Sequence, residues 1–136
     1  MKTRWIDRHL VVAPHYIGLC LSDKEFKREL KRLKIEREEW PPFLCGRHAN
    51  ATCHFFDNTK TGKRIALVCL GSTSKVESVQ IQGLLVHESV HIWQAIRDDI
   101  GERDPSSEFE AYSIQSIAQG LMQAYEDMTK KGAKRK

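Results

Sequence analysis

The sequence predicts an α+β domain in which a small antiparallel or mixed sheet is covered by helices. Short segments rich in β-branched and aromatic residues lie in the first half of the chain, and two long segments with helical periodicity make up the second half. A length of 136 residues is suitable for one domain with a buried core. We expect this domain to span residues 1–129, followed by a basic, disordered tail at residues 130–136.

The composition is that of a soluble globular protein, with 40% hydrophobic and 29% charged residues. No apolar run approaches the ~20 residues that span a bilayer, so we expect no membrane association. Charges at Arg4, Asp7 and Arg8 do not fit a signal peptide, and we expect a cytoplasmic protein. The net charge is +4, but the final KKGAKRK supplies five basic side chains. The remainder is close to neutral, so we expect no nucleic-acid partner. The oligomeric state stays open.

In the first half, residues 15–22 are typical of a short strand, and residues 23–38 of an exposed amphipathic helix capped by Ser22 or Asp23. The Trp-Pro-Pro sequence that follows should end this helix. Two further strands, at residues 51–58 and 63–70, flank a Thr-Lys-Thr-Gly turn and predict a β-hairpin.

In the second half, apolar residues recur at helical intervals from about Val76 to Ile100, and again from about Ser107 to Asp127. The first of these segments is apolar on nearly every side between Leu84 and Trp93, apart from its His and Glu residues, which predicts a central, buried helix.

The first long helix carries the motif H-E-x-x-H, as His87-Glu88-Ser89-Val90-His91. Residues four apart lie one above the other on a helix, so both imidazoles can reach one ion at about 2.0–2.1 Å. Glu88 lies about 100° further round the helix, where it can take the proton of a water activated by that ion. The alternative interpretation is that two histidines at the edge of the core simply bond to their neighbours. An apolar helix favours the metal, because burying these groups without partners costs free energy.

A catalytic zinc site has three protein ligands and one open position. The second long helix offers two candidates for the third ligand, Glu108 and Glu110. Glu110 follows Ser107 at the spacing of a capping box, which would give it a structural role. We therefore expect Glu108 to bind the metal.

HESVH, followed after 16 intervening residues by Glu108-Phe109-Glu110-Ala111, resembles the gluzincin metallopeptidases, and is closest to the small zincin-like domains of bacterial and prophage proteins. Those families carry a second-helix pattern E-x-x-A-(D/N) whose first Glu binds zinc, which again favours Glu108. Tyr112 stands where many relatives have Asp or Asn, and it could orient a ligand, donate a hydrogen bond to a developing oxyanion, or simply pack.

The resemblance implies a minimal zincin-like fold and a zinc-dependent peptidase that holds one Zn²⁺ through His87, His91 and Glu108, with Glu88 as general base. It also implies a peptide or protein substrate paired with an edge strand, either 51–58 or 63–70. Two alternatives remain. One is a zincin-fold binding or regulatory module that keeps its metal but has little proteolytic activity. The other is a phage-associated hydrolase of another amide, such as a cell-wall peptide cross-link.

Other signals are weaker. The four cysteines form no C-x-x-C pair, and we expect reduced thiols. Cys45, His48, Cys53 and His54 resemble a second zinc site, but Cys53 and His54 would point to opposite faces of a strand, which argues against it. Asp98 and Asp99 are candidates to support a histidine ligand. Trp93 is expected in the core.

Overall fold

The computed structural model describes residues 2–6, 15–46, 49–58, 60–73 and 75–130. Residues 131–136, most of the predicted basic tail, lie outside the described residues. The elements follow one another as β1 (Arg4–Trp5), β2 (His15–Cys20), α1 (Asp23–Arg32), a 3₁₀ turn η1 (Arg37–Glu39), β3 (Ala51–Asn58), β4 (Lys63–Leu70), α2 (Ser78–Asp99) and α3 (Ser107–Thr129). The predicted α+β class is confirmed. Within the described ranges, no helix has the length and apolarity needed to cross a bilayer.

The four strands form one mixed sheet in the order β1-β2-β4-β3. β4 lies parallel to β2 and antiparallel to β3, and β1 is antiparallel to β2. The predicted hairpin is therefore present as β3 and β4. The strand order also shows which of the two hairpin strands lies at the edge of the sheet. This strand is β3, whereas β4 is central.

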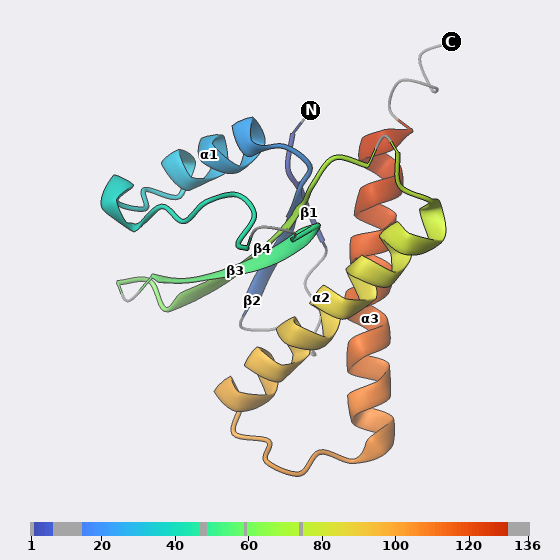
Figure 1. Ribbon diagram of the computed structural model, residues 1–136. Helices are drawn as coiled ribbons and strands as arrows, with labels where there is room; N and C mark the ends of the chain where they lie inside the picture. The colour runs from blue at the N-terminus through green and yellow to red at the C-terminus, as the bar shows by residue number, and fades with distance from the viewer. Residues whose placement is uncertain (1, 7–14, 47–48, 59, 74, 131–136) are drawn as a thin grey trace.

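Helices cover both faces of this sheet, with α1 on one face and α2 and α3 on the other (Figure 1). Strands β2 and β4 are therefore buried on both sides, which explains their nearly continuous apolar sequences. The larger core cluster lies between the sheet and the α2–α3 pair and includes Trp93, Ile92 and Leu121. A smaller cluster around Phe26 and Leu30 lies under α1.

The helix predicted over residues 23–38 ends earlier, at Arg32. Lys34 has φ of +58°, the Ile35 N–H donates to the Leu30 carbonyl, and the Lys34 N–H donates to the Lys31 carbonyl. These two bonds form a Schellman motif, which satisfies the last carbonyls of the helix and ends it. The chain then forms η1 instead of continuing α1. The start is as predicted, with the Ser22 hydroxyl accepting from the Glu25 N–H.

The predicted second-half helices are present as α2 and α3 with ends within two or three residues of those expected. The prediction of a central, buried helix holds for only one side of α2. One side packs on the sheet and α3, while Val79 and Val86 on the other side are 72% and 40% exposed. The motif helix is therefore a surface layer with one free face.

The two-residue strand β1 has no counterpart in the sequence-based prediction. It pairs with β2 and is held at the end of α3 by an ion pair between Arg4 and Asp127, with 3.0 Å between Nη2 and Oδ2. Two residues are too few to show alternation, so only the partner strand reveals it.

Candidate metal centre

The two motif histidines lie on the same side of α2, one turn apart, and both are exposed. Their Nε2 atoms are 3.2 Å apart. Two nitrogens that bind one tetrahedral zinc at about 2.0–2.1 Å lie about 3.3–3.4 Å from each other. The separation of the two Nε2 atoms is close to that of two ligands of one ion, and it is also the distance of a hydrogen bond between the two rings.

The environment of Glu88 differs sharply from that of its neighbour His87. The Glu88 side chain is only 5% exposed. Burial raises the pKa of this carboxyl, while the nearby His87, His91 and His54 oppose the rise. A carboxyl in this position can exchange a proton more readily near neutral pH than an exposed glutamate.

Gln94 gives His91 a second contact: its Oε1 lies 3.3 Å from His91 Nδ1. In the tautomer with the proton on Nδ1, His91 donates to this amide oxygen and Nε2 presents its lone pair. Sequence reasoning missed this residue. Gln94 could have been found from its position three residues after His91, because this spacing places both side chains on the same side of a helix.

A cavity of about 480 Å³ borders the motif, between the start of α2 and the start of β3. Its described lining consists of Asn50, Ala51, Val76, Gln80, Gly83, Leu84, His87 and Glu88. The edge strand β3 therefore begins beside the catalytic candidates, and a ligand in this cavity meets both a histidine and the carboxyl.

The structure does not gather the predicted third ligand with the histidines. In the part of the chain that it describes, no three His, Cys, Asp or Glu side chains are grouped so as to hold a metal. Glu108 is exposed in the first turn of α3. The choice of Glu108 as a ligand stays a prediction.

Glu110 has a structural role, although not the predicted one. Ser106, and not Ser107, caps α3, with its hydroxyl accepting from the Phe109 N–H. Glu110 instead accepts a hydrogen bond from the indole of Trp93, with 2.9 Å between Oε2 and Nε1. Trp93 is 1% exposed, which confirms its predicted place in the core. If Glu110 turned away to bind a metal, the buried indole N–H of Trp93 would lose its hydrogen-bond acceptor.

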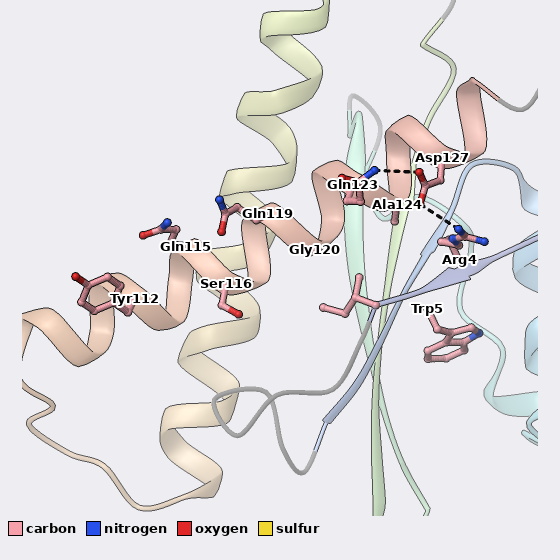
Figure 2. Close-up of a pocket in the computed structure, with 11 residues that line it drawn as sticks. Arg4, Trp5, Tyr112, Gln115, Ser116, Gln119, Gly120, Gln123, Ala124 and Asp127 are labelled. Carbon is pink, nitrogen blue, oxygen red and sulfur yellow. Dashed lines mark hydrogen bonds and ion pairs between the residues drawn. The ribbon is translucent and has the colours of Figure 1, made fainter. Parts of the chain in front are cut away.

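Tyr112 borders a different cavity. Together with Gln115, Gln119 and Gln123 of α3, it lines a groove of about 820 Å³ that extends to Arg4 (Figure 2). None of the described residues that line this groove also lines the cavity at His87 and Glu88. Tyr112 is 64% exposed. Its placement gives no support to a role on an oxyanion at the motif.

Of the two remaining candidates, Asp98 and Asp99, only Asp99 joins elements of the scaffold through its described contacts. Asp99 pairs with the buried His15, with 3.1 Å between Oδ2 and Nε2, and with Arg64, so it ties the end of α2 to the sheet. Asp98 is exposed and lies 4.0 Å from the Arg97 guanidinium.

The proposed objection to a second zinc site is confirmed. Cys53 packs on the α2 side of β3, whereas the His54 ring stacks on Phe26 under α1 and lies 3.0 Å from the Phe43 carbonyl oxygen. His48 lies outside the described residues. The cysteines Cys20, Cys45, Cys53 and Cys69 are free thiols, and burial raises the pKa of Cys53 and Cys69 far above the ordinary value.

In comparisons with known proteins, the sequence matches no family model, and no curated protein and no solved structure is detectably similar to this chain.

Proposed function

We propose that this protein is a zinc-dependent metallopeptidase whose site is centred on His87, Glu88 and His91. The observation that carries the proposal is the geometry of the motif: two exposed imidazoles with Nε2 atoms 3.2 Å apart, next to a carboxyl that is 5% exposed. Two imidazole nitrogens at this separation match two positions of a tetrahedral zinc site, which supports the proposal for two of the three protein ligands.

His87 and His91 would hold the ion, with Glu108 as the proposed third ligand. When bound, zinc would act as a Lewis acid towards a scissile carbonyl and would lower the pKa of a water molecule. Glu88 accepts the proton of the attacking water and then delivers it to the leaving amine. Gln94 would hold the His91 ring in the tautomer whose Nε2 carries a lone pair for the ion. An extended peptide substrate would run along the edge strand β3, beside the cavity at His87.

The test combines metal content with activity. We expect one equivalent of zinc in the purified protein, lost in His87→Ala and His91→Ala and retained in Glu88→Gln. Peptide cleavage should disappear in all three variants, with a loss of at least ~10²-fold in kcat/KM for Glu88→Gln. A protein that binds no zinc and is unaffected by chelator would refute the proposal.

A second candidate is a metal-binding module that retains zinc but cleaves little. The observation in its favour is that the described residues bring together two histidines without a third ligand. Stoichiometric zinc with no cleavage across a peptide library would favour this module, and cleavage of cell-wall cross-links alone would favour the amide hydrolase.

A further inference from the structure

Gly83 lies in the interior of α2, one turn before His87, and is exposed. Glycine is among the least favourable residues in the middle of a helix, because it loses the most conformational freedom on folding. Its presence there calls for a physical reason.

Every other described glycine has such a reason. Gly46, Gly62 and Gly101 have positive φ. At Gly18, Gly71 and Gly120 a Cβ atom would approach other atoms within 3.0 Å or closer. Gly83 has neither property: its φ is negative, and a Cβ atom there would meet nothing within 4 Å. Neither the backbone nor the packing of α2 requires a glycine at this position.

A side chain at position 83 would occupy part of the cavity beside the motif. Gln80, Gly83, Leu84 and His87 follow one another at spacings of three, one and three residues on the same side of α2, and all four line this cavity. A helical side chain leans towards the N-terminus of its helix, so a larger residue at 83 would project over the turn that contains Gln80. Because glycine has no side chain, part of this cavity of about 480 Å³ stays open.

The described lining defines the chemistry of this space. Ala51, Val76 and Leu84 are apolar, and Asn50 and Gln80 contribute neutral amides. Apart from the motif residues, none of the described residues in the lining is charged. A charged ligand side chain would lose its hydration here and, among the described lining residues, would find ionisable partners only in His87 and Glu88, whereas an aliphatic one would gain apolar contacts with the rest of the lining. The amides can pair with the main chain of a peptide.

We propose that Gly83 opens a side-chain subsite that accepts an uncharged, aliphatic residue of a peptide next to the motif. As a statement about cleavage specificity this rests on the proposed peptidase function, whereas the binding preference stands without it. Gly83 acts as the size limit, and Ala51, Val76 and Leu84 form the apolar wall.

The binding test uses the full chain and three probes, the N-acetyl amides of leucine, lysine and glycine, at millimolar concentrations. Backbone amide shifts of Ala51, Val76 and Leu84 report binding. We expect saturable shifts with the leucine probe, and binding at least fivefold weaker for the lysine and glycine probes. The variant Gly83→Leu should weaken leucine-probe binding at least tenfold, and Gly83→Ala less than threefold.

Gln82→Leu is the matched control, because it introduces the same leucine side chain at the adjacent position. Gln82 is exposed and does not line this cavity. It should leave probe binding within twofold. Equal binding of the three probes, or leucine-probe binding that survives in Gly83→Leu, would overturn the inference.

Cleavage of a peptide library separates this inference from the proposed function. We expect Gly83→Leu to lower kcat/KM at least tenfold for peptides with leucine beside the cleaved bond, relative to the same peptides with glycine. Probe binding without any cleavage in the wild type would refute the peptidase and support the subsite. Cleavage with a side-chain preference that Gly83→Leu leaves unchanged would support the peptidase and refute the subsite.

Discussion

At the scale of single residues, the proposed function would assign adjacent residues of the motif two tasks that require opposite environments. A metal ligand must reach its ion, and His87 and His91 are exposed. A general base works best when burial brings its pKa towards the working pH, and Glu88 is buried. One step of about 100° along a helix that packs on one side only is enough to place adjacent residues in these two environments.

The two candidate glutamates of α3 should respond to mutation in opposite ways. Glu110→Ala leaves the buried Trp93 indole N–H without its partner, and we expect it to lower the free energy of unfolding by about 1–2 kcal/mol. Glu108→Ala removes an exposed side chain and should change stability by less than about 0.5 kcal/mol. Urea unfolding of the metal-free protein checks both values.

Zinc binding should show the reverse order, with a much larger loss of affinity for Glu108→Ala than for Glu110→Ala. Direct titration with zinc under the same buffer conditions measures it. A greater loss for Glu110→Ala would identify Glu110 as the ligand and contradict the assignment of Glu108.

His15 should make stability depend on pH. Its ring is 3% exposed, Nε2 contacts Asp99, and the buried Nδ1 has no hydrogen-bond partner among the residues that the structure describes. Burial lowers the pKa of His15 below 6.5; Asp99 and Asp57 oppose this shift and Arg64 adds to it. The unfolded chain therefore binds a proton more readily than the folded one. The stability contribution is intact above pH 6.5 and is lost as pH falls through and below this value.

We therefore expect the free energy of unfolding to fall more between pH 7.5 and pH 5.5 in the wild type than in His15→Gln, which cannot titrate. Urea unfolding at the two pH values measures the difference. An identical decrease in both proteins would show that His15 does not contribute.

At the scale of elements, the end of α1 depends on a residue that is unusual in its place. Lys34 has φ of +58° at the position of the Schellman motif where glycine is most common. A side chain in this region strains the backbone, so we expect Lys34→Gly to raise the free energy of unfolding by about 0.5–1 kcal/mol. Lys31→Gly, in the last turn of α1, is the matched control and should lower it by about 1 kcal/mol. Thermal unfolding distinguishes the two; a loss of stability in both variants would contradict the cap.

The same residue explains where sequence reasoning failed on the fold. Helix α1 was predicted too long because a lysine gives no stop signal, whereas α2 and α3 were predicted well because each combines long periodicity with recognisable flanks. The free face of α2 was missed because valine and leucine on a helix surface are indistinguishable in sequence from those in a core.

The site was predictable to the extent that it lies on one helix. The spacing of His87 and His91 fixes the separation of their Cβ atoms, because the geometry of a helix does not depend on the rest of the fold. The position of α3 relative to α2 does depend on tertiary packing. The link between Trp93 and Glu110 and the location of Tyr112 in another groove therefore could not be obtained from spacing.

At the scale of the whole molecule, the motif helix is supported on one side and free on the other. Its inner face belongs to the main core with the sheet and α3, and its last residue, Asp99, is tied to β2 and β4 through His15 and Arg64. The histidine pair is therefore carried by the part of the molecule with the most buried apolar contacts. If the pair binds an ion as proposed, the core under α2 would hold the backbone of both ligands in place.

Zinc binding should consequently stabilise the fold by mass action. An ion that binds the folded chain alone adds about 2.7 kcal/mol to the free energy of unfolding when its free concentration is 100 times Kd. We expect urea unfolding to show that zinc raises the free energy of unfolding and that a chelator reverses this increase. The variant Glu88→Gln should show the same increase as the wild type. His87→Ala should lose it while keeping all four cysteines. Because zinc bound to thiols of the unfolded chain affects this variant and the wild type alike, the difference between them isolates the histidine site, and an equal response in both would place the ion elsewhere.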